Sequence, residues 1–253
     1  MIDIHTHPLC VNEGQDFPQV APLIARAKQH GIQHCVALGD VLAFGRLPTA
    51  QQIRKINEDT AKVVHSHPKF FTGFCHLNPT LGERAVWSEV EHGIELGLRG
   101  IKLEIANNAR DACMKPVMQA AARHDLIVLQ HAWSMTKIRQ RRYHTDPEDA
   151  AWLARKHPGV RMIMAHLTGC GVRGVLAAKH IDNLWVDTSG AAPEAGIVEY
   201  AVEHLGDRRI LYGSDIPIRD FASALARITG SALSKRSQQR ILNDNARELL
   251  RLS

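Results

Sequence analysis

Residues 2–7 read IDIHTH, a short apolar stretch that ends in two histidines two positions apart. Runs of this length, bounded by polar residues, are typical of buried parallel β-strands. An open doubly wound sheet, the main alternative, carries a glycine-rich turn after its first strand, whereas His-Thr-His stands at that place here. The stretch therefore favours a closed (β/α)8 TIM barrel, an α/β fold whose function lies at the carboxyl ends of the strands.

Seven further apolar runs continue this pattern along the chain. They lie at 34–39, 70–76, 100–105, 126–131, 160–166, 184–189 and 209–215. Between them, helical spacing predicts helices at 50–66, 84–97, 112–124, from Asp146 onward, 194–205 and 235–250. Eight strands that alternate with helices, at about 32 residues per unit, match the repeat of such a barrel. Because no linker-like stretch interrupts the pattern, we expect residues 1–253 to form a single domain.

The composition is that of an ordinary globular protein. Of the 253 residues, 45% are hydrophobic and 23% are charged, which excludes disordered and low-complexity architectures. The net charge of +5 permits anionic ligands, but few aromatic residues accompany the basic segments, so we do not expect nucleic-acid binding. Five widely spaced cysteines, no signal segment and no long apolar run predict a cytoplasmic protein without a membrane span. A homo-oligomer is compatible with this composition.

Metal-capable side chains follow five of the eight predicted strands. His5 and His7 end the first strand, and because side chains two apart in a strand point to the same side, both imidazoles can hold one ion. The candidates on the fourth, fifth, sixth and eighth strands are Glu104, His131, His166 and Asp215. Imidazoles combined with carboxylates suit Zn²⁺ or a similar divalent cation, with one position open to water. We expect one or two such ions.

At these positions the chain resembles the amidohydrolase superfamily, in its branch of amidohydrolase-related TIM-barrel metal enzymes. The matching pieces are IDIHTH at 2–7, GIKLE at 100–104, VLQHAW at 128–133, MAHLTG at 164–169, VDTSG at 186–190 and YGSDIP at 212–217. The resemblance implies that the metal ligands are His5, His7, His131 and Asp215. It also implies that Asp215 takes the proton from the attacking water, and that His166 either acts on the substrate or binds a second metal.

Glu104 and Asp3 each permit two interpretations. A glutamate that bridges two ions would support, with His166, a binuclear centre in which both ions stabilise reacting oxygens. The alternative is a buried ion pair between Lys102 and Glu104, which are two residues apart and face the same side. Asp3 either hydrogen-bonds a metal ligand or is a buried carboxylate at the barrel floor.

Arginines near the predicted site indicate an anionic substrate, because guanidinium groups bind carboxylates and phosphates bidentately. The loop after the fifth strand is basic, and Arg110, Arg173 and Arg219 follow other strands. A solvated basic loop is the alternative explanation. Arg219 is the best candidate for binding the substrate, and Trp133 and His76 are candidates for lining its pocket.

Several reactions are compatible with this site. The first is hydrolysis of an ester, lactone or amide bond in a small, carboxylated molecule by a metal-activated water. The second is metal-dependent decarboxylation, which a mononuclear centre with a metal-free His166 would favour. The third is phosphodiester cleavage by a binuclear phosphodiesterase or nuclease. We predict the metal-dependent hydrolase. A binding protein without catalytic activity is a fourth possibility, which the complete ligand set disfavours because such a protein has no need for an open metal position.

Overall fold

The computed structural model describes residues 1–11, 19–104, 107–134, 144–192 and 194–252. The strands in these ranges are β1 (Ile2–Thr6), β2 (His34–Ala37), β3 (Phe71–Gly73), β4 (Cys75–Leu77), β5 (Gly100–Leu103), β6 (Ile127–Gln130), β7 (Met162–Met164), β8 (Leu184–Asp187) and β9 (Ile210–Leu211). The α-helices are α1 (Val20–Gln29), α2 (Ala50–Ser66), α3 (Glu83–Glu95), α4 (Met114–Arg123), α5 (Pro147–Lys156), α6 (Leu167–Ala178), α7 (Ile197–Leu205), α8 (Phe221–Thr229), α9 (Lys235–Gln239) and α10 (Asn245–Leu250). None of the helices in these ranges combines the length and the apolar character that a membrane crossing requires.

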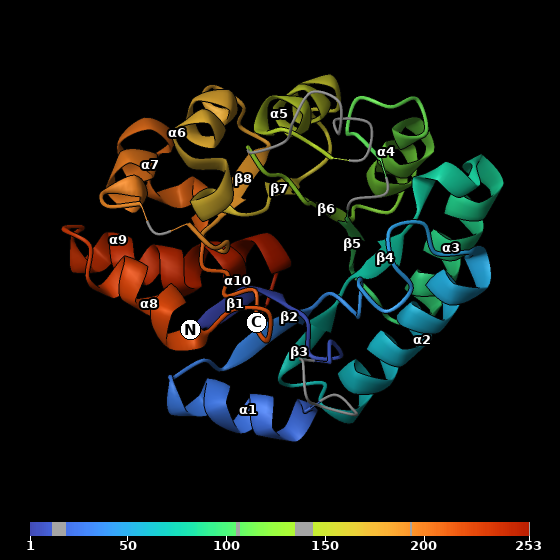
Figure 1. Cartoon of the computed structure of the whole chain (residues 1–253), viewed down its shortest axis with the longest axis horizontal. Coiled ribbons are helices and arrows are strands. Elements are labelled where there is room, and N and C mark those ends of the chain that lie inside the picture. The colour runs from blue at the N-terminus through green and yellow to red at the C-terminus, as the bar shows by residue number, and fades with distance from the viewer. Residues whose placement is uncertain (12–18, 105–106, 135–143, 193, 253) are drawn as a thin grey trace.

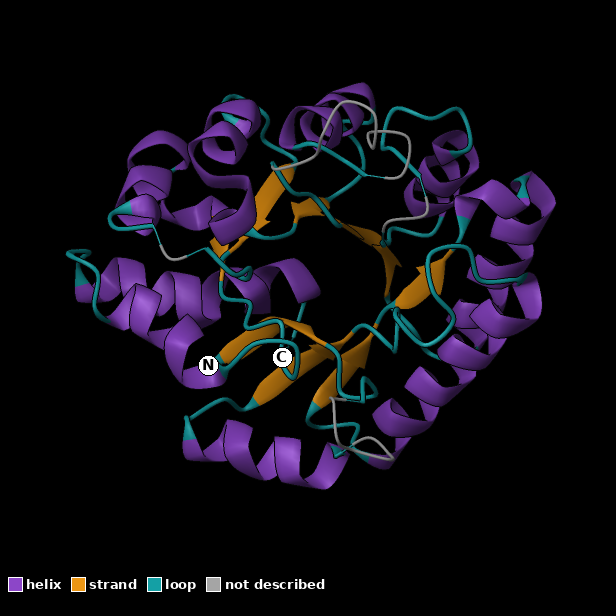
Figure 2. Ribbon diagram, in the orientation of Figure 1, coloured by secondary structure: helices purple, strands orange, loops and turns teal. Residues whose placement is uncertain are grey.

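The strands form a closed ring (Figure 1). Neighbours run in the orders β1-β2-β3 and β4-β5-β6-β7-β8-β9, and every paired strand is parallel to its neighbour. The two sheets meet where the Arg99 amide, just before β5, donates to the Gly73 carbonyl of β3 at 2.8 Å. The ring closes where the Ile4 amide donates to the Tyr212 carbonyl at 2.9 Å. Helices surround the ring in Figure 2, so the predicted TIM barrel is confirmed.

Apolar side chains fill the barrel and leave one rim for polar groups. One buried cluster joins inward-facing strand residues to Ala246 and Leu249 of α10, so α10 covers the end of the barrel where the strands begin. A larger cluster packs the outer faces of the strands against the surrounding helices. The polar residues that follow the strands therefore collect at the opposite end, where the strands finish.

Local sequence explains where two of the helices begin. Thr49 and Gln52 form a reciprocal capping box at the start of α2. Asp146 and Asp149 do the same for α5, with Pro147 at its first position. Such caps satisfy backbone amides that have no partner within the helix. The helix predicted from Asp146 onward is thus confirmed.

Three parts of the barrel differ from the sequence analysis. The strand expected at 70–76 is two strands, β3 and β4, because the pairing partner changes from β2 to β5 at Phe74. The ring of Phe74 fills the space above Gly100, where a Cβ would lie 2.6 Å from it. The helix expected at 235–250 contains a π-helical turn at Arg240–Asp244 between α9 and α10. Helices α1, α6 and α8 were not identified from the sequence.

Candidate active site

Three buried side chains converge where the strands finish. His5 and His7 come from the end of β1, and Asp215 from the turn after β9. The Nε2 atoms of His5 and His7 lie 3.5 and 3.6 Å from Asp215 Oδ1. One ligand atom of each residue lies within 4.8 Å of the other two. Ligands about 2.1 Å from a tetrahedral Zn²⁺ are about 3.4 Å apart, so these separations fit a shared ion.

Hydrogen bonds on the far nitrogens orient both imidazoles. Nδ1 of His5 lies 2.8 Å from Asp187 Oδ2, and Nδ1 of His7 lies 3.0 Å from the Gly39 carbonyl oxygen. Because a carboxylate and a carbonyl only accept hydrogen bonds, each Nδ1 carries the proton and each Nε2 keeps its lone pair. Histidines that bind metals are held in this way. Both rings therefore direct their Nε2 atoms, the candidate ligand atoms, towards Asp215.

Asp187, the last residue of β8, connects several parts of the site. Besides His5, it accepts hydrogen bonds from the His166 amide at 3.1 Å, the Ser189 amide at 3.0 Å and the Ser189 hydroxyl. The sequence analysis assigned it no role. Its position at the end of a predicted strand, within VDTSG, is the signal that could have identified it.

His166 and Asp215 share an uncommon backbone conformation. Their φ angles are 69° and 65°, in the left-handed region, which costs a residue other than glycine on the order of 1–3 kcal/mol. The Asp215 amide donates to the His5 carbonyl at 2.9 Å, and the His166 amide donates to Asp187. These bonds hold the two turns so that His166 Nε2 lies 3.8 Å from Asp215 Oδ2.

Glu104 and His131 form a second group beside the first. Glu104 Oε1 lies 3.0 Å from His131 Nδ1, and Oε2 lies 3.2 Å from Nζ of the fully buried Lys102. Nζ of Lys102 is in turn 3.4 Å from His5 Nε2. The buried Lys102–Glu104 pair weighed in the sequence analysis is therefore present. His131 does not join the three-residue group, but its ring lies 4.7 Å from that of His166, and its role as a ligand stays a prediction.

Burial keeps imidazoles of this site neutral. It lowers the pKa of His7 and His166 well below the ordinary histidine value, and that of His76 to about 4. Burial also raises the pKa of Asp215, against the opposing charge of Lys102. The site thus offers uncharged nitrogen donors, as metal binding requires, beside a carboxylate of increased basicity.

Carboxylates outnumber cationic groups around this region. Burial opposes the ionisation of Glu104, yet the hydrogen bond from His131 and the charge of Lys102 hold its pKa well below the usual range. Burial likewise opposes the ionisation of Asp187, and His5 holds its pKa below the usual range. With Asp215, the described residues place three carboxylates against one buried lysine. A divalent cation would balance that excess charge.

Trp133 stands beside the site, as a pocket wall would. Its ring centroid lies 5.4 Å from that of His166. This position depends on Gly169 in α6, because a Cβ there would lie 2.5 Å from the indole ring. His76 pairs with Lys102 across β4 and β5, so its buried imidazole lies on the same inward face. The use of Trp133 and His76 in substrate binding stays a prediction.

Two of the predicted arginines bind protein carboxylates instead of facing the site. Arg110 donates to Asp149 at 2.6 Å, and Arg173 donates to both carboxylate oxygens of Glu148 at 2.9 and 2.7 Å. Asp149 and Glu148 belong to the first turn of α5. These arginines therefore attach neighbouring loops to that helix.

Arg219 is exposed near the rim, and its backbone amide donates to the Asp215 carbonyl at 2.9 Å. The structure places no other component of the site against its guanidinium group within the described residues, so its role in substrate binding stays a prediction. Most of the basic loop after the fifth predicted strand, residues 135–143, lies outside the described residues.

Asp3 supports the backbone under the site. Its Oδ1 accepts hydrogen bonds from the His5 amide at 3.1 Å and the Ser214 amide at 3.0 Å. These two bonds hold in place the segments that carry His5 and Asp215, and both of them are made to backbone amides and not to an imidazole. Burial raises its pKa to about 7.

The parallel barrel and the histidine–aspartate group at the end where its strands finish define the class of this protein, which is a TIM-barrel enzyme. A family model described as amidohydrolase matches residues 2–252, and the chain belongs to that family. Among curated proteins, no sequence matches this chain. The recognised resemblance to the amidohydrolases is therefore confirmed over nearly the whole chain.

Solved structures share the fold at low sequence identity. A 2,6-dihydroxybenzoate decarboxylase from Rhizobium is 15% identical, with a TM-score of 0.77 over 99% of this chain and 98% of its own. A dihydroxybenzoic acid decarboxylase from Polaromonas, with bound manganese and the inhibitor 2-nitroresorcinol, is 17% identical, with a TM-score of 0.77 over 99% and 96%. A Pseudomonas putida protein, provisionally described as a 2-pyrone-4,6-dicarboxylic acid hydrolase, is 18% identical, with a TM-score of 0.69 over 98% and 96%.

Proposed function

We propose that this protein is a metal-dependent hydrolase that cleaves an ester, lactone or amide bond in a small anionic molecule. The observation that carries the proposal is the buried group of His5, His7 and Asp215, whose ligand atoms face one another. In this proposal, residues 1–253 act as one catalytic domain.

His5 Nε2, His7 Nε2 and Asp215 would hold the cation, and His131 is a further candidate ligand. Two imidazoles and a carboxylate suit Zn²⁺, which we expect to bind, although one structural relative contains manganese. When bound, the cation supplies a Lewis acid that polarises the substrate and lowers the pKa of a water. The fit rests on the lone pairs that both imidazoles keep at Nε2 and on the excess of carboxylates around them.

Asp215 and His166 are the proposed catalytic residues. Asp215 accepts the proton of the attacking water, aided by the burial that raises its pKa. His166 Nδ1 lies 3.3 Å from the Ala132 carbonyl oxygen, so the neutral ring carries its proton there and presents a lone pair at Nε2. Since Nε2 is 3.8 Å from Asp215 Oδ2, this lone pair can accept a hydrogen bond from the protonated Asp215 through a small shift or a water.

Residues at the rim would select the substrate. Trp133 forms a flat apolar wall against His166, which suits a ring-shaped or planar body. Arg219 supplies a guanidinium group at the surface for a carboxylate, and His76 contributes a neutral imidazole on the inward face. This division of roles favours a small carboxylated molecule.

Metal-dependent decarboxylation is the second candidate. It is favoured by one observation, that His166 lies outside the three-residue group, because a mononuclear centre leaves that imidazole free to act on a substrate. Two structural relatives named above are decarboxylases of dihydroxybenzoic acids. Phosphodiester cleavage is less well supported, since both oxygens of Glu104 already contact His131 and Lys102.

A product analysis separates these reactions. Purified protein loaded with Zn²⁺ or Mn²⁺ is incubated with lactones, aryl esters, phosphodiesters and aromatic carboxylic acids in H₂¹⁸O. A hydrolase places ¹⁸O in the product acid, whereas a decarboxylase releases CO₂ without labelling the remaining ring. Activity that survives in His5→Ala with metal removed would contradict both metal-dependent proposals.

A further inference from the structure

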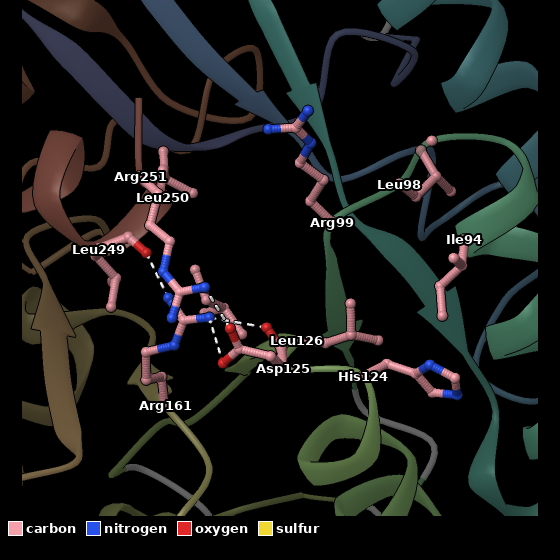
Figure 3. A pocket seen from close by; sticks show the side chains of 12 residues that line it. Ile94, Leu98, Arg99, His124, Asp125, Leu126, Arg161, Leu249, Leu250 and Arg251 are labelled. Carbon is pink, nitrogen blue, oxygen red and sulfur yellow. Dashed lines mark hydrogen bonds and ion pairs between the residues drawn. The ribbon is translucent and has the colours of Figure 1, made fainter. Parts of the chain in front are cut away.

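A cavity of about 420 Å³ lies at the end of the barrel opposite the candidate active site (Figure 3). Arg99, Leu126 and Arg161 directly precede β5, β6 and β7, and all three line it. The ends of α3 and α10 complete the wall, where Ile94 and Leu249 are found. Its described lining includes no residue of the candidate active site, so the cavity is a separate space.

Positive charge dominates this cavity. Arg161 donates to the Asp125 carbonyl at 2.8 Å, to its carboxylate at 2.9 Å and to the Leu249 carbonyl at 2.6 Å. Arg251 lies 2.5 Å from the other carboxylate oxygen of Asp125. A single carboxylate is thus shared by two guanidinium groups, and Arg99 adds a third. With three arginines against one aspartate, the lining carries an excess of two positive charges.

Arg161 has a structural role, but Arg99 has none that the described residues reveal. Arg161 joins the end of α10 to the segment before β7 through the Leu249 carbonyl, which is an unpaired group at a helix end. The exposed Arg99 makes no side-chain hydrogen bond or ion pair within the described ranges. His124, which also lines the cavity, has a buried Nε2 without a hydrogen-bond partner in those ranges. Buried polar groups without partners are uncommon and call for an explanation.

The remaining wall is apolar. Figure 3 shows Arg161, Arg251 and Asp125 together on one side of the cavity, and Ile94 and Leu98 on the other. Small-molecule sites typically have volumes of about 300–1,000 Å³ and combine apolar walls with a few polar groups that fix orientation. The size and composition of this cavity match that description.

We propose that this cavity binds a small organic anion, separately from catalysis. Its apolar body would lie against Ile94 and Leu98, and its carboxylate, sulfonate or phosphate group would accept hydrogen bonds from Arg99. The excess positive charge selects the anion, and the apolar wall selects against a bare inorganic ion.

The test uses the full-length, metal-loaded protein and the fluorescent anion 8-anilinonaphthalene-1-sulfonate, which has an apolar body and one anionic group. The wild type should bind one molecule per chain. Arg99→Gln should weaken binding about tenfold or more, the effect of losing a charge-assisted hydrogen bond. Arg84→Gln is the matched control, because Arg84 is an exposed arginine outside the cavity and its replacement makes the same change in net charge.

Two further variants test the shape and the location of the site. Ile94→Trp fills the cavity without changing its charge and should also weaken binding. His5→Ala removes a candidate metal ligand at the other end of the barrel and should leave binding unchanged. The uncharged N-phenyl-1-naphthylamine should bind weakly and should not respond to Arg99→Gln. Equal affinity in Arg99→Gln and Arg84→Gln, or loss of binding in His5→Ala, would overturn the proposal.

Discussion

Replacing Asp187 with asparagine tests the orientation of the metal-type ligands. The substituted side chain keeps one carbonyl oxygen, which the His166 and Ser189 amides would retain because they both bond Oδ1 at 3.1 and 3.0 Å. Its NH₂ group would then face the proton on His5 Nδ1, where the wild-type carboxylate accepts at 2.8 Å. Two donors cannot share that contact, so His5 must turn away or move its proton to Nε2, the proposed ligand atom.

The expected loss follows from this geometry. Removing such a partner of a metal-binding histidine costs about 10–100-fold in metal affinity, which corresponds to about 1.4–2.7 kcal/mol. The assay is a competitive titration of Zn²⁺ or Mn²⁺ against a chromophoric chelator. Asp182→Asn serves as the control, because Asp182 is an exposed aspartate two residues before β8. An affinity of Asp187→Asn within twofold of this control would refute the reasoning.

Three further predictions address the pocket wall, the floor and the number of ions. Gly169→Ala should displace the Trp133 ring and raise KM about tenfold or more with a smaller change in kcat; unchanged steady-state kinetics would remove Trp133 from the substrate pocket. The Tm difference between Asp3→Asn and the wild type should increase as the pH rises from 4 to 7 and then stay constant. Asp3 has a pKa of about 7 in the folded protein, above the unfolded 3.8, so its ionisation destabilises the folded wild type over this range. Thermal melts that give the same Tm difference at every pH would contradict this. By elemental analysis, the wild type and Glu104→Gln should both contain one ion per chain. Two ions in the wild type and one in Glu104→Gln would instead support the bridging interpretation.

The sequence alone was enough to predict the barrel and to select three candidate ligands that the structure brings together. The H-x-H pair at His5 and His7 predicts a shared metal site, because strand periodicity places both side chains on one side of the strand. Asp215 follows from the rule that functional residues lie at the carboxyl ends of barrel strands. The distances of 3.5 and 3.6 Å from Asp215 Oδ1 to the Nε2 atoms of His5 and His7 agree with that prediction.

Other features depend on tertiary contacts that no local pattern contains. The partner of His5 is Asp187, 182 residues away in the chain, and only the closed ring brings them together. Arg110 and Arg173 looked like substrate ligands, but carboxylates in the first turn of α5 bind them. Helix α6 was missed because its glycine-rich sequence is a weak helix former, and Thr168 and Gly171 in it have non-helical dihedral angles.

Anomalous X-ray diffraction from crystals grown with Mn²⁺ or Zn²⁺ tests the central claim most directly. We predict one strong peak per chain, within bonding distance of His5 Nε2, His7 Nε2 and an oxygen of Asp215. The peak should disappear in crystals of the His5→Ala variant, provided that the far-UV circular dichroism spectrum of this variant in solution matches that of the wild type. A fully occupied ion bound elsewhere, or no ion between these three side chains at saturating metal, would contradict the account.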